Sequence, residues 1–542
     1  MTALPRSKPH LRPRAAASAY TAASHTNPDL KSWQPGIASA DAELLPELGT
    51  IVARSRDLVR NSGIAAGAEQ TIVDNVVGTG LRLNAAPDWR ALGIDRDAAE
   101  AWSNNVEAYW RMWADTTACD TTGRMTFADQ TALVARSVFQ SGAALALPLW
   151  LPEPGEPYAL RLQILDPDRL CNPNHAPDRD GLRGGIEADR YGRPQAYWLR
   201  STHPFEGFSL RSAAGEWQRI PARTEWGRAR LIYCAPITRP GQTRGVPALA
   251  AVMRQFKVLG DYQSAELKAA VVNAMVALVA ETPMDSEALA TLFSGDSEFA
   301  SLLAARGEVK PKEGMIIPLL PGERLNAVAP ARPAAAFPAF TMAVMRHIAA
   351  GLNIPYELLL KDFSQTNYSS ARAALLEAWR YFKSRRAWLA AHWARPVYEL
   401  WLEEAISKGH VDAPNFYARR AAWSRARWIG PGRGWIDPVK EANASETRLR
   451  IGITTLEDEC AEQGADWEEV AEQRAREKAK LDELGLDQVA TLPDAAPGGA
   501  VEDYDQREDD ADDAREDDAE DQRQRAELAL ESRVLDLLGG QS

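Results

Sequence analysis

The chain has 542 residues, of which 45% are hydrophobic, and a formal net charge of −13. This length exceeds what one ordinary core supports, so we expect two or more domains or one subunit built from several parts. The acidic balance argues against tight, sequence-independent DNA binding, which depends on Lys and Arg displacing counterions from phosphates. Much of the negative charge is local, because fifteen Asp and Glu stand against five Arg between Val501 and Arg533.

The cysteines and the apolar runs exclude further classes. The four cysteines lie far apart without a CxxC pair, which favours reduced thiols in a cytosolic compartment over a zinc or disulfide framework. Residues 1–30 contain no apolar run of the kind that opens a signal peptide. The longest apolar run, Ala269–Ala280, is too short for a bilayer, which needs about twenty residues, so we expect a buried helix segment and no membrane association.

The N-terminal part is predicted to be a basic arm followed by helices. Residues 1–38 carry Arg6, Lys8, Arg12 and Arg14 among prolines and alanines, which is typical of a flexible arm. Helical periodicity then predicts helices over Asp41–Arg60, Gly67–Val77, Arg96–Met112 and about Phe127–Gln140.

Strand-like runs broken by Pro, Gly and Asp turns dominate from Ala143 to Tyr233 and predict an antiparallel sheet. Pro247 suits the first turn of a new helix, and the helical pattern runs on to Val279, a length of roughly 50 Å at 1.5 Å per residue. A short helix at Ser286–Phe293 and strands at Gly314–Leu320 and Leu325–Val328 follow. They form a compact αβ insertion that is closed by a helix over Phe337–Ala350.

The most informative stretch is Ala349–Phe382. Gly351, Asn353 and Pro355 predict that a helix ends near Ala350 and gives way to an irregular connection. Asn367 or Ser369 could cap the next helix, whose apolar stripe is Leu375, Trp379, Phe382, Leu389 and Trp393. A loop between two long helices is suited to presenting residues to a partner.

The C-terminal part is predicted to be helix-rich, with a low-complexity end. Helices are expected over Asp437–Ile451 and Trp467–Leu484. The tail from 491 to 542 is acid-rich and predicted to be disordered, although Leu528–Leu538 could form a short amphipathic helix on binding a partner. Seventeen tryptophans, many in the second half, suggest broad assembly surfaces.

The sequence offers no catalytic constellation. A GxxxxGK[ST] loop, an HExxH motif and a GxSxG elbow are all absent, and Gly78-Thr-Gly80 is interpreted as a turn. Asp166 and Asp168 could gather with Glu187 and Asp189 around a metal, but Pro167 between the two aspartates favours a turn. We therefore predict no enzyme activity, no catalytic residues, no cofactor and no metal.

One basic cluster remains open. Arg380, Lys383, Arg385 and Arg386 lie on the helix after the presented loop. A solvated helix face is the favoured interpretation, and a contact with DNA or another subunit is the alternative.

Several separated motifs resemble the lambda-type bacteriophage portal proteins. The resemblance spans about Ser39 to Lys480 and rests on six stretches whose order and spacing together are specific. They are Arg54-Ser-Arg-Asp-Leu-Val-Arg-Asn61, Asn75-Val-Val-Gly-Thr-Gly-Leu81, Gly185-Ile-Glu-Ala-Asp-Arg-Tyr-Gly-Arg-Pro194, Arg239-Pro-Gly-Gln-Thr-Arg-Gly-Val-Pro247, Asn367-Tyr-Ser-Ser-Ala-Arg372 and Ile436-Asp-Pro-Val-Lys-Glu441.

This resemblance implies an α+β, mainly helical portal fold with wing, stem, clip and crown parts that assembles as a ring, usually of twelve subunits. The implied parts are a wing over 39–245, a stem helix over 246–280, a clip over 281–330, a second stem helix over 331–352, a tunnel loop over 353–367, a long helix and wing return over 368–436, and a crown over 437–490. The arm at 1–38 and the tail at 491–542 have no assigned family counterpart.

The resemblance also implies a function and partners. The ring would be the channel at one capsid vertex through which double-stranded DNA is packaged and ejected, in the virion and, during assembly, in the host cytoplasm. Its partners would be terminase, head-completion or adaptor proteins and the major capsid protein. The DNA-facing tunnel-loop residues would be Leu358, Leu359, Leu360, Lys361, Asp362, Phe363, Ser364 and Gln365.

Within that loop, Lys361 is expected to contact phosphate, whereas Phe363 and Leu358–Leu360 are expected to pack against neighbouring loops. Two alternatives of other classes stay open: a capsid-associated scaffold or adaptor protein, and a DNA-packaging enzyme.

Overall fold

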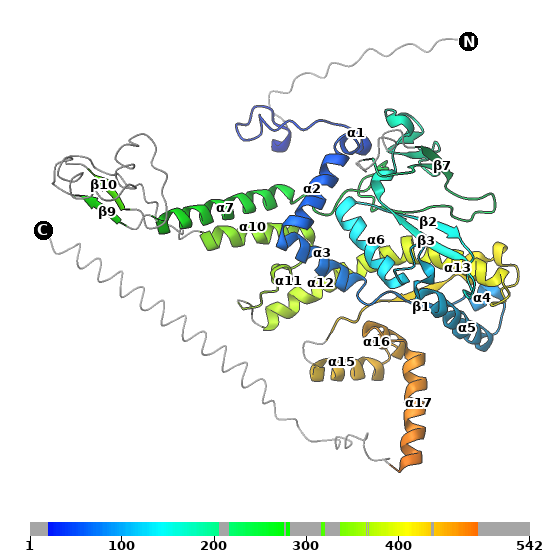
Figure 1. The fold of residues 1–542 in the computed structure, drawn as a ribbon. Coiled ribbons are helices and arrows are strands. Elements are labelled where there is room, and N and C mark those ends of the chain that lie inside the picture. The colour runs from blue at the N-terminus through cyan, green and yellow to red at the C-terminus, as the bar shows by residue number, and fades with distance from the viewer. Residues whose placement is uncertain are drawn as a thin grey trace, which may run out of the picture. The chain divides into compact units, whose positions relative to one another are not determined.

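The computed structural model describes residues 20–204, 216–275, 278–281, 316–319, 337–364, 366, 368–434 and 438–485, with the backbone alone at 272–275, 278–281, 316–319 and 368. The chain divides into two compact units, Met1–Glu469 and Val470–Ser542. Helices and strands are mixed in the first unit (Figure 1). The described part of the second unit is the remainder of one helix, α17 (Trp467–Leu484).

The structure contains the predicted N-terminal helices, with bounds that differ by a few residues from the predicted ones. They are α1 (Ala40–Leu44), α2 (Leu48–Asn61), α3 (Gly63–Val76), α5 (Arg96–Ala114) and α6 (Phe127–Ser141), with a short α4 (Trp89–Leu92). One continuous helix over Asp41–Arg60 is wrong, because Pro46 separates α1 from α2. Thr126 and Asp129 form a reciprocal capping box that starts α6.

The strands between Ala144 and Cys234 form two antiparallel sheets, where one was predicted. The first has the order β3-β2-β8, from β2 (Ala144–Trp150), β3 (Leu160–Leu165) and β8 (Ile232–Cys234). The second has the order β4-β5-β6-β7, from β4 (Leu182–Arg183), β5 (Ile186–Ala188), β6 (Pro194–Arg200) and β7 (Trp217–Pro221). Two short 3-10 helices after β3, at Pro167–Arg169 and Pro173–His175, turn the chain away before the second sheet begins.

A third pair of strands had no clear signal in the sequence. Strand β1 (Arg82–Ala85) pairs antiparallel with β11 (Ala426–Ile429), so that Arg82 lies opposite Ile429. This pairing joins the segment that follows α3 to the segment that follows α14, more than 300 residues later in the sequence.

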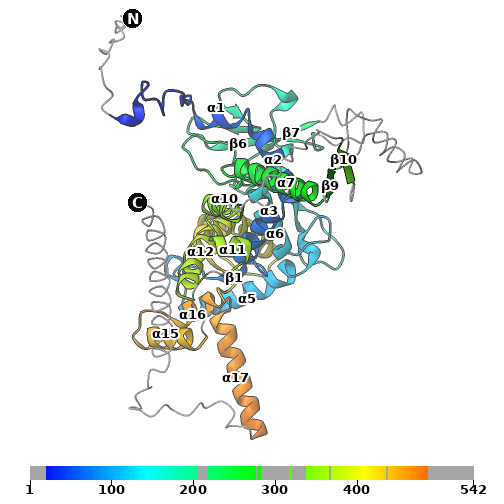
Figure 2. The same cartoon turned by 90° about the vertical axis from the view of Figure 1, so that its left-hand side faces the viewer.

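Helices α7 (Met253–Met275) and α10 (Phe337–Leu352) lie side by side, as Figures 1 and 2 both show. The Tyr262 ring packs against Phe337 and Phe340, with ring centroids 5.3 and 4.9 Å apart. Helix α7 is shorter than the helix predicted from Pro247 to Val279. It begins at Met253, and the backbone at Leu278–Glu281 forms a strand, β9.

Strand β9 pairs in parallel with β10 (Ile316–Leu319), which confirms part of the strand predicted at Gly314–Leu320. The predicted helix at Ser286–Phe293 and strand at Leu325–Val328 lie outside the described residues. The apolar run at 269–280 was predicted to be a buried helix segment. In its described part Val271 is 45% exposed, so the prediction of burial is wrong there for the single chain.

The segment after α10 differs from the predicted irregular loop. It contains the short helix α11 (Tyr356–Leu360), which begins after Pro355 and ends where Lys361 adopts a left-handed conformation with φ +56°. Asn367, one of the two predicted caps of the next helix, lies outside the described residues.

Helix α12 (Tyr368–Leu389) then runs through a π-helical turn, Ala390–Ala394, into α13 (Arg395–Ser407). Pro396 does not break this helix. The carbonyl oxygen of His392, four residues earlier, accepts a hydrogen bond from the Cys234 thiol at 3.1 Å in place of the N–H that proline lacks.

The remaining helices are α14 (Arg420–Trp423), α15 (Pro438–Arg450), α16 (Leu456–Glu462) and α17, with further 3-10 turns at Thr21–Ala23, Thr117–Cys119 and Phe416–Ala418. The helices predicted over Asp437–Ile451 and Trp467–Leu484 are confirmed by α15 and α17. Within the described residues, no helix is both long and apolar enough to span a bilayer.

Many of the tryptophans build the chain's own core. The indole of Trp110 contacts that of Trp401, with ring centroids 5.3 Å apart, and Phe127 stacks on Trp393 at 5.9 Å. Because Trp393, Trp401 and Trp423 are each at most 4% exposed, the expectation that the tryptophans line assembly surfaces is wrong for these three.

Candidate functional site

The eight predicted DNA-facing residues divide into two groups. Leu359 is 4% exposed in the main core, and Leu358 and Leu360 pack against that core from α11. The three leucines therefore pack against their own chain, Leu358 and Leu360 only in part, which argues against the expectation that they face DNA or neighbouring loops. Gln365 lies outside the described residues.

The exposed tip consists of Lys361, Asp362, Phe363 and Ser364. The carboxylate of Asp362 accepts hydrogen bonds from the Ser364 hydroxyl at 2.7 Å and the Ser364 N–H at 3.0 Å, which lowers the pKa of Asp362. Phe363 is 41% exposed. The tip thus presents one cation, one ionised carboxylate and one aromatic ring on a turn ordered by its own hydrogen bonds.

The basic cluster on α12 divides in the same way. Arg380 and Lys383 are exposed and paired, with Glu377 at 3.0 Å and Glu462 at 2.8 Å, and the exposed Arg385 lies over the Tyr381 ring. Pairing of this kind at the surface is typical of a solvated helix face and leaves little free positive charge.

Arg386 is a structural residue, which corrects its place among the possible basic contacts. Its side chain is buried and donates to the carbonyl oxygens of Asn75, Val76 and Pro431 at 2.9, 3.2 and 3.0 Å. Burial lowers the pKa of Arg386 to about 10. The Arg386 guanidinium also lies over the Trp379 ring, 5.1 Å from its centroid, so backbone carbonyls and an aromatic face hold this charge.

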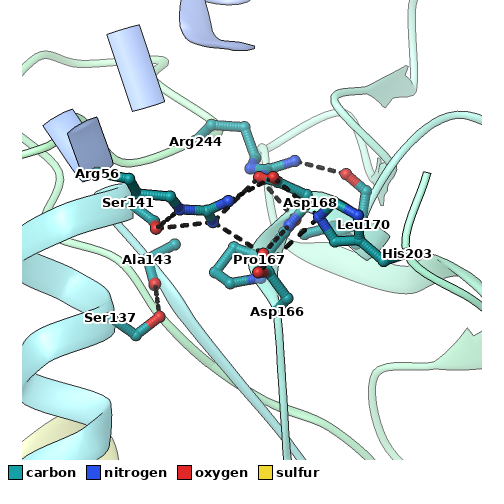
Figure 3. A network of polar contacts seen from close by, with 10 residues as sticks. All are labelled: Arg56, Ser137, Ser141, Ala143, Asp166, Pro167, Asp168, Leu170, His203 and Arg244. Carbon is teal, nitrogen blue, oxygen red and sulfur yellow. Dashed lines mark hydrogen bonds and ion pairs between the residues drawn. The ribbon is translucent and has the colours of Figure 1, made fainter. Parts of the chain in front are cut away.

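The Asp166-Pro-Asp168 turn is held by an arginine. Figure 3 shows the guanidinium of Arg56, from α2, between the two aspartates, at 2.8 Å from Asp166 and 2.7 Å from Asp168. Burial alone would lower the pKa of Arg56, but the two carboxylates more than offset it, so this pKa lies above its ordinary value. His203 lies 3.3 Å from Asp168 on the other side.

Among the described residues, Asp166, Asp168 and His203 are the one group with the spacing of metal ligands. The Arg56 guanidinium already pairs with both carboxylates, so a metal ion there would stand beside a like charge. The other two suggested carboxylates point elsewhere, since Glu187 pairs with Arg219 at 2.6 Å and Asp189 accepts from the Tyr191 N–H within its own turn. The residues do not fit a metal site.

The charged turn Arg239–Gly245 is a joint before α7. Arg244 is 6% exposed and donates to three carbonyl oxygens, those of Leu170, Gly184 and Pro167, at 2.7, 2.9 and 3.1 Å. Thr243 donates its N–H and its hydroxyl to Asp41 on α1. The turn thereby fixes the chain entering α7 to both the sheet region and the first helix, and Figure 3 shows Arg244 with its partner Leu170.

The contacts of Arg56, Arg244 and Arg386 give a structural role to three of the sequence stretches that resemble portal proteins. Arg56, Arg244 and the Asn75 carbonyl belong to three of the quoted stretches, and each holds together segments far apart in sequence. Sequence reasoning missed them as functional residues, although their position within those stretches was a signal. The geometry supports a structural subunit with an exposed tip at residues 361–364.

Comparisons with known proteins agree with this geometry. The family described as phage portal protein, lambda family, matches residues 26–386. The portal protein of Escherichia phage N15 is 33% identical over 504 residues, which cover 89% of this chain and 94% of that protein. Portal protein B of Escherichia phage lambda is 32% identical over 505 residues, covering 89% of this chain and 93% of that protein.

More distant similarities are also found. A probable portal protein of Halomonas phage phiHAP-1 is 26% identical over 493 residues. Among solved structures, a chain from the neck of an empty GTA particle is 14% identical with a TM-score of 0.39, covering 76% of this chain and 93% of its own, a likeness too distant to carry an argument. The family match and the two relatives that align over 89% of the chain together show that this chain belongs to the lambda family of phage portal proteins.

Proposed function

We propose that this chain is the portal protein of a phage particle, in which copies form a closed ring around a channel for double-stranded DNA at one capsid vertex. The observation that carries this proposal is the alignment with two portal proteins over more than nine-tenths of their own length. Cyclic closure needs two different complementary surfaces on each copy, and a long chain with several parts can provide them.

The paired helices α7 and α10 are the proposed stem. Their outward side supports contact between copies, because Leu267 and Val271, one helical turn apart on α7, are 68% and 45% exposed in the single chain. The remaining parts are proposed as expected from the resemblance, with the wing at 39–245 and 368–436, the clip at 281–330 and the crown at 437–490. The clip would meet terminase and later the head-completion proteins, and the rim of the ring would meet the major capsid protein.

The proposed DNA-facing surface is narrower than the loop expected from the sequence. It consists of the tip residues Lys361, Asp362, Phe363 and Ser364. One cation beside one ionised carboxylate gives the tip no net charge. A tip of this kind would touch phosphates only weakly, because tight binding requires several cations to displace counterions. Weak contact suits a channel through which DNA must slide.

Native mass spectrometry of the purified chain tests the assembly. The proposal predicts a single large closed oligomer, and only monomers or dimers under all assembly conditions would contradict it. Deleting residues 501–542 should leave that oligomer intact. Loss of the oligomer in this variant would instead favour a scaffold or adaptor whose acidic tail organises the complex. The same preparation should turn over no ATP, since a packaging enzyme would.

A further inference from the structure

Residues 438–469, here called the α15–α16 arm, are attached to the rest of the chain by polar contacts. Arg427 on β11 pairs with Glu457 at 2.8 Å and with Asp458 at 2.7 Å. Lys383 on α12 pairs with Glu462 at 2.8 Å, and Arg433 pairs with Glu441 at 3.3 Å. At the far end of the arm, Arg82 and Arg111 both pair with Glu469, and Asn84 donates to Asp466 at 2.8 Å.

Apolar packing contributes little to this attachment. In the described residues of the arm, Asp466 is the one residue that is buried. Five of its larger apolar side chains are exposed by 36 to 69%, namely those of Val439, Leu449, Ile451, Ile453 and Leu456, whereas Trp467 is partly buried. Because hydrophobic stabilisation scales with apolar area removed from water, the arm gains little from it.

Two cavities lie between the arm and the body, and Ile429 and Gly430 line both of them. The larger, of about 700 Å³, has Ala390 and Ala391 of the π-helical turn on the body side and Thr454 and Ala461 on the arm side. The smaller, of about 520 Å³, extends from Leu81 on the body to Gly464 on the arm. The backbones approach closely at one point, where a Cβ at Gly432 would lie 2.7 Å from the Gln463 carbonyl oxygen. Elsewhere the two surfaces are joined by ion pairs across a boundary that these cavities leave poorly filled, unlike the close packing of a protein core.

Glu107 on α5 lies beneath the far end of the arm. It is 8% exposed, and its carboxylate accepts the Ala85 N–H of β1 at 2.7 Å. The groups that face it are Arg111 on its own helix, Asp466 and Glu468 on the arm, and Tyr398 on α13. Desolvation by burial, reinforced by the negative charge of Asp466 and Glu468, raises the pKa of Glu107 to about 7.

We propose that the α15–α16 arm is a releasable element of the subunit, whose docking on the body is set by ionic strength and by the protonation of Glu107. The ion pairs attract the arm and are screened by salt. The like charges of Glu107 and Asp466 oppose docking only while Glu107 is ionised.

The sign of the pH effect follows from linkage. The approach of Asp466 and Glu468 makes the pKa of Glu107 higher in the docked arm than in the released one, so docking is tightest at acid pH and weakens as the pH rises through about 7. Asp458, one of the attracting carboxylates, accepts a hydrogen bond from Arg427, which lowers its pKa and keeps it ionised. Docking should therefore change in one direction between weakly acidic and weakly alkaline pH.

Hydrogen exchange of the full-length assembled protein tests this inference, with rates corrected for the intrinsic effect of pH. At pH about 7, raising salt from about 50 to about 500 mM should lower the protection of peptides within 456–469 by on the order of tenfold, because screened pairs lose most of their attraction. At low salt, moving from about pH 5.5 to about pH 8 should lower it by roughly threefold to tenfold, since one unit of pKa difference is a tenfold change in the equilibrium.

Three variants separate the causes. Glu107→Gln keeps an acceptor for the Ala85 N–H but removes the charge, so it should abolish the pH effect and keep the salt effect. Asp466→Asn removes the charge that faces Glu107. It should reduce the pH effect because the pKa of Glu107 then differs less between the docked and the released arm. Glu100→Gln on the exposed side of the same helix is the matched control and should behave as the parent protein.

Unchanged protection across both salt and pH would overturn the proposal of a releasable arm. A pH effect that persists in Glu107→Gln would overturn the role of Glu107. Because the experiment compares the protection of one segment within the same assembly, its outcome is independent of how many copies form that assembly.

Discussion

The guanidinium of Arg386 on α12 donates to the carbonyl oxygen of Asn75 near the end of α3 at 2.9 Å, across 311 residues of sequence. The last carbonyls of a helix have no partner within it, and Arg386 satisfies two of them together with the Pro431 carbonyl. A Cβ at Gly430 would lie 2.4 Å from the Arg386 Nε atom, so glycine makes room for this clamp. The long helix behind the exposed tip is thereby fixed to the N-terminal helices.

Replacing Arg386 should destabilise the subunit. Arg386→Lys cannot reach three carbonyls with one ammonium group, and we expect a loss of about 2–4 kcal/mol in the free energy of unfolding because buried acceptors lose their donors. Urea denaturation of both proteins measures it. Arg385→Lys, at the exposed neighbouring position, is the control and should stay within about 0.5 kcal/mol of the parent.

The ion pairs of Arg56 with Asp166 and Asp168 predict that replacements of Arg56 and Asp168 have non-additive effects on stability. Arg56→Ala leaves the two aspartates of the turn side by side without their cation, which should cost about 1–3 kcal/mol of unfolding free energy. In Asp168→Asn one of those charges is already gone, so the same arginine replacement should cost less. A double-mutant cycle measures the difference, and purely additive effects would show that the ion pair does not hold the turn.

The contact between Gly142 and Gly245 predicts a severe steric effect. A Cβ at Gly245 would lie 1.8 Å from the Gly142 carbonyl oxygen, which is backbone and cannot move aside without shifting the joint before α7. Gly245→Ala should cost about 3 kcal/mol or more in thermal unfolding. Gly260→Ala in the middle of α7 meets nothing within 4 Å and should instead stabilise by about 0.5–1 kcal/mol.

The tip residues should affect DNA handling without affecting assembly. Lys361→Gly removes the charge and suits the left-handed backbone at φ +56°, whereas Lys361→Arg keeps the charge. We expect Lys361→Gly and Phe363→Ala to alter the amount of DNA packaged per particle, and Lys361→Arg to behave as the parent. Unfolding free energies should stay within about 1 kcal/mol. Loss of the oligomer in these variants would show that the tip is structural.

Local signals in the sequence predicted the elements that local interactions form. The charged helix at Trp467–Leu484 and the start of α6 at Phe127 follow from periodicity and capping, which depend on neighbouring residues. The short helix α11 was missed because Pro355 was interpreted as a helix breaker, whereas it precedes a helix whose Leu359 reaches the core.

Features that depend on distant residues could not be predicted. The pairing of β1 with β11 joins positions 82 and 429, and the continuation of the helix past Pro396 depends on the Cys234 thiol. The burial of Arg386 depends on carbonyls from two other segments, so a basic residue at helical spacing resembled its exposed neighbours. The sequence predicted a presented loop at this position but not that its leucines pack against the core of their own chain, and the contact of the tip with DNA stays a prediction.

Electron microscopy of the purified full-length protein tests the central claim most directly. The proposed function predicts ring-shaped particles with cyclic symmetry and an open central channel in class averages. Particles without a central pore under all assembly conditions would contradict it.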